Sequence, residues 1–237
     1  MNATAPRDVP SSFDAGASAY DKLVGANPGY HEHLRLSARR MKLPDEGRGL
    51  RLLDVGCGTG ASTAALVAAA PHAEIVAVDG SAGMLAQAAT KTWPTSVRFV
   101  HSYAEELADN GVVGPFDGIF AAYLVRNLAN PDAQLRTFSG LLRPGGVLAV
   151  HEYSVRDSRL AIAVWNVVSS AIIIPAGRLR TGDASLYRYL RRSVNEFDGA
   201  AAFRQRLRNN GFDKVRSETM PGWQRNVVHT FLAEPAP

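Results

Sequence analysis

The chain has 237 residues, of which 46% are hydrophobic and 20% are charged, a composition typical of a soluble globular protein with one sizeable domain. No charge-free apolar run demands a bilayer span, and the single cysteine, Cys57, excludes an internal disulfide framework and a Cys-rich zinc site, as in a reducing cytoplasm. The net charge of +4 comes mainly from arginines in the last third. Solvated helix faces explain these arginines, and an anionic membrane leaflet is the alternative partner.

The first 19 residues are small and polar, contain prolines, and lack the apolar core of a secretory signal. We expect residues 1–19 to form a flexible arm and residues 20–237 to form a single domain.

From residue 50, short apolar strands alternate with helical stretches. The expected strands are 50–56, 73–80, 97–102, 116–124 and 146–154. The expected helices are 61–70, 81–93 and 131–142, with a helical turn near 104–110 and a turn at "RPGG", 143–146. This alternation predicts right-handed βαβ units and a doubly wound, mostly parallel sheet that is covered on both faces.

After residue 154 the pattern changes. The stretch 160–177, "LAIAVWNVVSSAIIIPAG", is apolar nearly all round a helix that we expect to end at Pro175. It is too short and polar for a confident membrane span, so it predicts either a buried core helix or a lid or membrane-facing element. A helix at 201–212, capped by Gly211, and a closing antiparallel hairpin are expected to complete the sheet.

The stretch "LLDVGCGTGAS", residues 52–62, has glycines at three alternate positions directly after the first predicted strand. Gly56, Gly58 and Gly60 allow a sharp turn and a close approach of the backbone to a ligand at the start of the next helix. Asp79 ends the second strand, where its carboxylate can accept both hydroxyls of a ribose. These features serve NAD as well as S-adenosylmethionine.

Asp54, two residues before the first glycine, separates the two ligands. A carboxylate there would repel a pyrophosphate, but it suits the amino-bearing, sulfonium-containing half of S-adenosylmethionine. The alternative is that Asp54 only caps the glycine turn.

Three segments together resemble the Rossmann-like class I methyltransferases. The glycine stretch resembles their motif I, "AVDGSAGML" their motif II, and "LLRPGGVLAV" a turn that they share. The resemblance implies a seven-stranded sheet with an antiparallel C-terminal hairpin and a small helical cap, and S-adenosylmethionine as the cofactor. The implied cofactor residues are Tyr20, Asp54, Gly56, Cys57, Gly58, Gly60, Asp79, Gly80, Met84, Ser102, Tyr103, Ala104 and Ala122.

A nucleic-acid acceptor is not expected. Amino-group base methylases carry an Asn/Asp-Pro-Pro-aromatic box after strand four, where this chain reads "FAAYLVRNL". Carbon-5 pyrimidine methylases need a cysteine in their catalytic loop, whereas Cys57 lies inside the glycine loop.

Longer stretches resemble the ubiquinone/menaquinone biosynthesis C-methyltransferase family, over about Tyr20 to Ala233. They are 116–154, which contains an "RN" pair, 174–197, 207–215 and 227–233. The resemblance implies transfer of a methyl group to a ring carbon of a prenylated quinol. It also implies that Arg126 and Asn127 lie beside the reacting ring, with Arg126 orienting a water or stabilising the developing phenolate. The alternative for Arg126 is a surface ion pair.

Other positions carry open alternatives. Glu152 either faces the acceptor or is a surface acid at a strand end, and Tyr20 either closes over the cofactor or packs between helices. His101, His151 and His229 have no metal spacing, so we expect packed or solvated histidines and no metal. Where many relatives have Gly-Asp before "AE", this chain has Ser102 and Tyr103, so adenine recognition would rest on the backbone and Ser102.

The sequence therefore predicts a cytoplasmic S-adenosylmethionine-dependent methyltransferase of a lipophilic aromatic acceptor. Helices within 20–45 and 155–195 are expected to cap its active site, with peripheral contact to the inner face of the membrane. By resemblance, it would form a homodimer. The alternatives are a C- or O-methyltransferase of a small phenolic or natural-product metabolite, and a non-catalytic module that binds S-adenosylmethionine or NAD.

Overall fold

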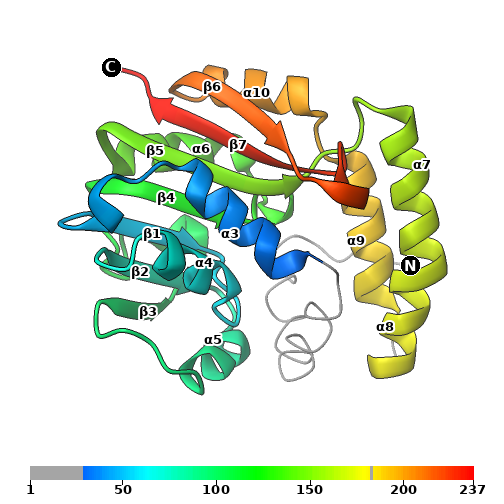
Figure 1. Ribbon diagram of the computed structural model, residues 1–237, viewed down its shortest axis with the longest axis horizontal. Coiled ribbons are helices and arrows are strands. Elements are labelled where there is room, and N and C mark those ends of the chain that lie inside the picture. Colours follow the sequence, from blue (N-terminus) through cyan, green and yellow to red (C-terminus); the bar gives the residue numbers. More distant parts are fainter. Residues whose placement is uncertain (1–28, 182–183) are drawn as a thin grey trace.

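The computed structural model describes residues 29–181 and 184–237, which contain a seven-stranded sheet in the order β3-β2-β1-β4-β5-β7-β6 (Figure 1). Strands β1 to β5 are parallel, and β7 runs antiparallel between β5 and β6. The strands are β1 (Arg51–Val55), β2 (Glu74–Asp79), β3 (Val97–His101), β4 (Phe116–Ala122), β5 (Leu142–Tyr153), β6 (Phe212–Thr219) and β7 (Val228–Pro235). This topology confirms the predicted Rossmann-like class with its antiparallel C-terminal hairpin.

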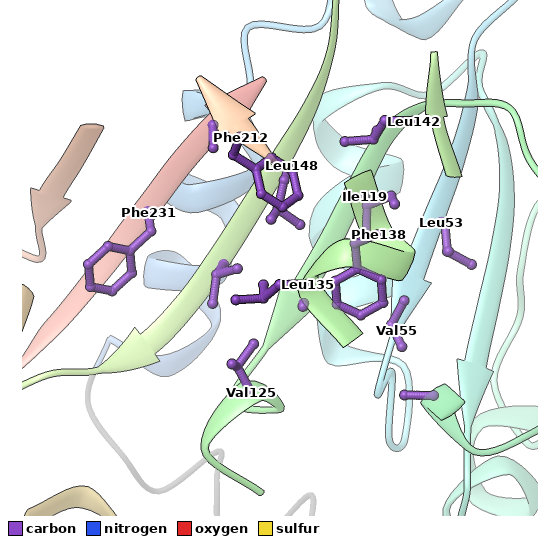
Figure 2. Close-up of a cluster of buried hydrophobic side chains, with 14 of the residues drawn as sticks. Leu53, Val55, Ile119, Val125, Leu135, Phe138, Leu142, Leu148, Phe212 and Phe231 are labelled. Carbon is purple, nitrogen blue, oxygen red and sulfur yellow. The ribbon is translucent and has the colours of Figure 1, made fainter. Parts of the chain in front are cut away.

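Helices cover both faces of the sheet because strand residues alternate between the faces. Leu53 and Val55 of β1 join a core with α6 (Pro131–Leu141) and α10 (Ala200–Asn209), and Figure 2 shows part of this cluster. Leu52 joins the opposite core with α3 (Tyr30–Arg40) and α4 (Ala61–Ala69). Burial of β1 on both faces explains its nearly continuous apolar sequence.

Side-chain caps set several helix starts. Asn130 accepts a hydrogen bond from the Ala133 amide, with proline at the first position of α6. Ser81 caps α5 (Ala82–Ala89), and Ser158 caps α7 (Arg159–Val168), in the same way.

Three predicted boundaries differ in the structure. Helix α5 ends at Ala89, four residues before the expected end at Trp93, whose indole N–H donates to the Ala88 carbonyl. Strand β4 ends at Ala122 because Tyr123 takes a left-handed φ of 55°. The "RPGG" stretch is not a turn before β5 but an irregularity inside it, where the pairing with β4 shifts between Phe116 and Gly118.

The apolar helix differs most from expectation. It continues through Pro175 as α7, a π-helical turn η5 (Ser169–Ile173) and α8 (Ile174–Thr181). A π turn before the proline accommodates the missing amide N–H and the bulk of the ring. Arg159–Leu179 is long and apolar enough to cross a membrane, by length and composition, and only 22% of its apolar stretch is buried. The expectation of a buried core helix is therefore wrong, because few elements pack against it.

A third apolar cluster joins α7 and α9 (Ser185–Glu196) to the end of β5 and to β7, through Tyr153, Trp165 and Val194 among others. Figure 1 shows α7, α8 and α9 grouped at one end of the sheet. Because α7 follows β5 directly, this is the end where the parallel strands finish.

Candidate active site

A cavity of about 500 Å³ lies at the carboxyl ends of β1, β2 and β4. Ligands of open parallel sheets bind at this edge, where the strand order reverses, and here that point lies between β1 and β4. The cavity brings together most of the residues that the sequence predicted. They are Gly56, Cys57, Gly58, Asp79, Gly80, Met84, Ser102, Tyr103, Ala104, Ala122, Arg126 and Asn127.

The glycine loop is held against the end of β2 by its backbone. The amides of Gly56 and Cys57 donate to the Val78 carbonyl at 2.8 and 2.9 Å. Gly56 has a φ of 75°, and a side chain there would meet Leu124 at 3.1 Å. Gly58 has a φ of 55° and nothing within 4 Å of an added Cβ, on the side of the loop that lines the cavity. The loop thus leaves its backbone open to a ligand.

Asp54 and Gly60, both predicted to bind the cofactor, lie behind this wall and are not among the lining residues. An added Cβ at Gly60 would lie 2.5 Å from the Trp93 ring, so packing requires this glycine. Asp54 is fully buried, and its Oδ2 accepts hydrogen bonds from the Ser62 and Thr63 hydroxyls at 2.8 and 2.7 Å. Its Oδ1 has no hydrogen-bond partner among the described residues.

Burial raises the pKa of the Asp54 carboxyl from 3.8 to about 7, against the opposing hydrogen bonds from Thr63 and Ser62. The protonated Asp54 carboxyl therefore adds its full contribution to the unfolding free energy below the pKa of the unfolded chain, about 3.9. This contribution is lost as the pH rises through the pKa of the folded protein. Asp54→Asn cannot ionise and so does not lose this contribution. We expect the unfolding free energy of the variant, relative to that of wild type, to rise by roughly 3 kcal/mol from acidic to neutral pH. Denaturant titrations of both ligand-free proteins across this range measure the gain. A difference that does not change with pH would contradict it.

Asp79 ends β2 with both carboxylate oxygens bonded to backbone amides. Oδ2 accepts from Gly58 at 2.7 Å, and Oδ1 accepts from Ser81 at 2.8 Å. These two bonds fix the orientation of the carboxylate at the cavity wall. A carboxylate at this position, the end of the second strand, is the group that accepts the ribose hydroxyls in nucleotide-binding folds of this kind.

The turn after β3 and helix α5 form another wall of the cavity. The Ser102 hydroxyl donates to the Tyr103 carbonyl at 2.9 Å and accepts from Asn110 Nδ2 at 3.0 Å. Met84 is nearly buried, whereas Tyr103 is 42% exposed. This wall combines apolar and aromatic surface with backbone polar groups, which suits a planar base.

Arg126 and Glu152 form a buried ion pair on the β4 side of the cavity. Nη1 of Arg126 donates to Oε1 of Glu152 at 2.6 Å, and the side chains are 7% and 0% exposed. Burial alone would lower the pKa of Arg126, but Glu152, Tyr153 and Tyr189 together outweigh it and raise the pKa, so the guanidinium stays charged. Glu152 is thus not a surface acid, and Arg126 is not in a surface ion pair.

The carbonyl of Tyr123 holds both members of the predicted catalytic pair. It accepts from Arg126 Nη1 and from Asn127 Nδ2, each at 3.0 Å. The Tyr189 hydroxyl of α9 donates to Asn127 Oδ1 at 3.1 Å. The 3-10 turn η4 (Val125–Asn127) is therefore anchored to β4, β5 and α9.

One predicted site residue cannot be placed, and several residues at the cavity were not predicted from the sequence. Tyr20 lies outside the described residues. The sequence analysis missed Tyr30, Tyr123 and Leu124, which line the cavity, and Tyr189. An aromatic residue directly after β4 was a signal for Tyr123, but its role depends on partners far away in the sequence.

One of the three histidines lies buried next to the site. His151 is buried by packing, with hydrogen bonds to Ser37 and Tyr123. Across residues 29–181 and 184–237, no three His, Cys, Asp or Glu side chains gather as a metal site would require.

The described residues fit S-adenosylmethionine. Asp79 is oriented to accept a ribose diol, and the open backbone at Gly58 lies beside it. Asp54 lies behind Ser62, which lines the cavity and donates to its Oδ2, and its Oδ1 has no hydrogen-bond partner among the described residues. The side chain near the glycine loop is therefore an acid, and not a cation that would bind phosphate. This donor set suits a cationic ligand better than a pyrophosphate.

Comparisons with known proteins agree with this geometry. The model of the ubiE/COQ5 methyltransferase family matches residues 1–229. The chain is 35% identical over 219 residues to the ubiquinone/menaquinone biosynthesis C-methyltransferase of Bradyrhizobium diazoefficiens, covering 89% of this chain and 85% of that protein. It is 30% identical over 217 residues to the demethylmenaquinone methyltransferase of Clavibacter sepedonicus, covering 91% and 86%.

Among solved structures, the magnesium protoporphyrin IX methyltransferase of Synechocystis superposes with a TM-score of 0.66 at 14% identity, over 98% of this chain and 99% of that one. At this identity the likeness concerns the fold alone. The family match and the relatives, together with the cavity beside the glycine loop, lead to one conclusion: the chain belongs to the ubiE/COQ5 methyltransferase family and is an S-adenosylmethionine-dependent methyltransferase.

Proposed function

We propose that this enzyme methylates a ring carbon of a prenylated quinol of the demethylmenaquinol type. The support comes from the family, from relatives named for ubiquinone/menaquinone biosynthesis and demethylmenaquinone methylation, and from one observation that carries the proposal. That observation is the buried, charged Arg126, fixed by Glu152 on the wall of the cofactor cavity. A positive charge held there stabilises the phenolate oxygen that makes the neighbouring ring carbon nucleophilic.

S-adenosylmethionine, when bound, supplies an electrophilic methyl group on a sulfonium. The protein must then position the ring carbon in line with that methyl group, while the proton that the ring loses leaves to a water in the cavity. Arg126 stays protonated and is no literal base, so it acts as a hydrogen-bond donor to the phenolate or to a water beside it. Arg126 lines the cavity, and its guanidinium is the group assigned to this contact. Asn127, held by Tyr123 and Tyr189, orients the ring beside it.

The residues at the ends of β1, β2 and β3 are assigned to S-adenosylmethionine. Asp79 binds the ribose, and the loop of Gly56, Cys57 and Gly58 lies along the methionyl half. Asp54 lies behind that loop and acts through Ser62, while Gly60 supports its packing. The adenine wall comprises Gly80, Met84, Ser102, Tyr103 and Ala104, and Ala122 closes the floor at the end of β4.

The test is mass spectrometry of the purified protein with S-adenosylmethionine and chemically reduced demethylmenaquinone. A product one methyl group heavier, with the label on ring carbon when a methyl-labelled cofactor is used, is the expected result. A methyl ether in its place would contradict carbon transfer. No product, with S-adenosylmethionine binding shown by calorimetry, would move the assignment to a small soluble phenolic acceptor.

A prenylated substrate resides in the membrane. Helices α7 and α8 are assigned as the surface that contacts this membrane. Leu160, Val167, Ile172 and Leu179 are 74%, 65%, 61% and 87% exposed. Only a narrow stripe of the same helix faces inward, at Ala161, Trp165, Ser169 and Gly177. Exposed arginines flank the apolar face at 159 and 178, which suits an anionic leaflet. Together with α3 and α9, these helices form the proposed cap of a cytoplasmic enzyme on the inner face of the membrane.

We expect Val167→Glu/Ile172→Glu to weaken binding to anionic phospholipid vesicles about tenfold or more, because two apolar contacts with lipid become charged. Vesicle co-sedimentation measures this, with Val113→Glu, an exposed apolar residue before β4, as the matched control. Equal binding of wild type and variant would contradict the assignment. If the substitutions instead split a wild-type dimer in light scattering, this face belongs to the homodimer that the resemblance implied.

A further inference from the structure

The side-chain amide of Asn127, on the cavity wall, is held at both ends. Its Nδ2 donates to the Tyr123 carbonyl at 3.0 Å, and its Oδ1 accepts from the Tyr189 hydroxyl at 3.1 Å. One of these bonds alone would still allow the amide to rotate, but the two together fix its plane and the end that carries the oxygen. Because Asn127 lines the cavity, these bonds set the polar surface that an acceptor meets there.

Tyr189 belongs to α9, which lies between α7 and the sheet (Figure 1). Arg191 and Asn195 lie one turn apart on the same side of α9, because a helix has about 3.6 residues per turn. The same geometry places Tyr189 roughly on the opposite side. Helix α9 therefore presents one side to α7 and the other side to η4.

The side of α9 that faces α7 is bound by a polar residue that interrupts the apolar run 160–168. Asn166 Oδ1 accepts from Arg191 Nε at 3.1 Å and from Asn195 Nδ2 at 3.0 Å. The indole N–H of the buried Trp165 donates to the Arg191 carbonyl at 3.4 Å. A polar side chain at a helix contact costs free energy unless it is hydrogen-bonded, and here one oxygen accepts from two donors. These bonds fix the position of α9 against α7.

Two steps therefore connect the exposed helix α7 with the turn η4. Asn166 of α7 holds α9, and Tyr189 of α9 holds the amide of Asn127. Arg126 lies in the same turn, but its ion pair with Glu152 of β5 does not involve α9. A loosened contact between α7 and α9 should consequently disturb Asn127 and leave the buried ion pair in place.

We propose that Tyr189 and Asn166 are positioning residues for the methyl transfer. Tyr189 holds the Asn127 amide in the orientation that the acceptor ring requires, and Asn166 holds the helix that carries Tyr189. This inference rests on the proposed function, because that function assigns Asn127 to the acceptor ring. It extends the catalytic machinery to α7, so the helix that is assigned to the membrane also supports the geometry of the reacting ring.

The first test needs no acceptor. Nuclear magnetic resonance of the isotopically labelled full chain with S-adenosylhomocysteine detects side-chain amides, and Asn127→Ala identifies the Asn127 signals by their loss. We expect Tyr189→Phe and Asn166→Leu each to shift these signals, because both release the amide. Ser193→Ala is the matched control and should leave them unchanged, since Ser193 Oγ donates to the Leu190 carbonyl within α9 at 3.1 Å. Unmoved signals in Tyr189→Phe or Asn166→Leu, or an equal shift in the control, would overturn the inference.

Turnover of reduced demethylmenaquinone measures the consequence for the reaction. Tyr189→Phe and Asn166→Leu should lower kcat about tenfold and change the KM for S-adenosylmethionine by less than about twofold, because ring orientation and not cofactor binding is lost. Tyr189→Phe should add no further loss to Asn127→Ala, since it acts through that amide. Asn166→Asp keeps the acceptor oxygen and should restore most of the kcat that Asn166→Leu loses. Wild-type kcat in Tyr189→Phe, or losses that add in the double variant, would contradict the proposal.

Failure of the proposed function is a separate result. If wild type does not methylate reduced demethylmenaquinone but the Asn127 signals move as expected, the positioning of Asn127 stands and only that acceptor is lost. If wild type turns over but the signals stay in place, the acceptor stands and the inference is overturned. If Asn166→Leu does not fold, Asn195→Leu, which removes one of the two donors to Asn166, takes its place in both tests.

Discussion

Replacement of Arg126 by alanine is expected to lower kcat about 100-fold or more and to lower the unfolding free energy by about 3–5 kcal/mol. The first loss follows because the charge beside the developing phenolate disappears. The second follows because Glu152, which is fully buried, keeps its carboxylate with no cation beside it. Turnover of reduced demethylmenaquinone and denaturant titration measure the two effects, and calorimetry should show that S-adenosylmethionine still binds.

A double variant separates the two effects. Arg126→Met/Glu152→Leu replaces the buried pair by apolar side chains of similar size, so most of the stability should return while turnover stays lost. Lys214→Ala is the control for breaking an exposed pair, because Lys214 and Glu234 lie 2.7 Å apart at 71% and 28% exposure. That control should cost less than about 1 kcal/mol. Wild-type turnover in either Arg126 variant would show that the arginine is only structural.

Asp79→Ala is expected to weaken S-adenosylmethionine binding about 100-fold, because it removes the acceptor for two ribose hydroxyls. It also removes the carboxylate that holds the Gly58 and Ser81 amides, so the loop loses its fixed position. Isothermal titration calorimetry with the purified variant measures the loss.

Asp117→Ala is the matched control for this prediction. Asp117 is also a strand aspartate whose carboxylate accepts a backbone hydrogen bond, from Arg51 at 2.8 Å, but it is not among the residues that line the cavity. The control should lose stability and keep its affinity for the cofactor. Equal affinities of wild type and Asp79→Ala would remove Asp79 from the site.

Much of the fold was predictable because its signals are local. Strands such as β1 and β2 are buried on both faces and therefore read as mainly apolar runs, with turn residues between them and the helices. The glycine loop was predictable for the same reason, since Gly56 and Gly58 are needed for backbone conformation rather than for distant contacts. Boundaries failed where a contact from elsewhere decided them, as at Trp93 and Tyr123.

The sequence by itself determined the doubly wound sheet and the glycine loop with Asp79, since spacing and alternation encode them, and the resemblance to the family added the Arg126–Asn127 pair. Only the tertiary structure decided that Asp54 lies behind the loop, that Glu152 is the buried partner of Arg126, and that His151 hydrogen-bonds the Tyr123 hydroxyl. It also decided that the helix from Arg159 to Leu179 is largely exposed. These features depend on contacts between side chains of strands and helices that are far apart in the sequence, and the local sequence pattern does not encode such contacts.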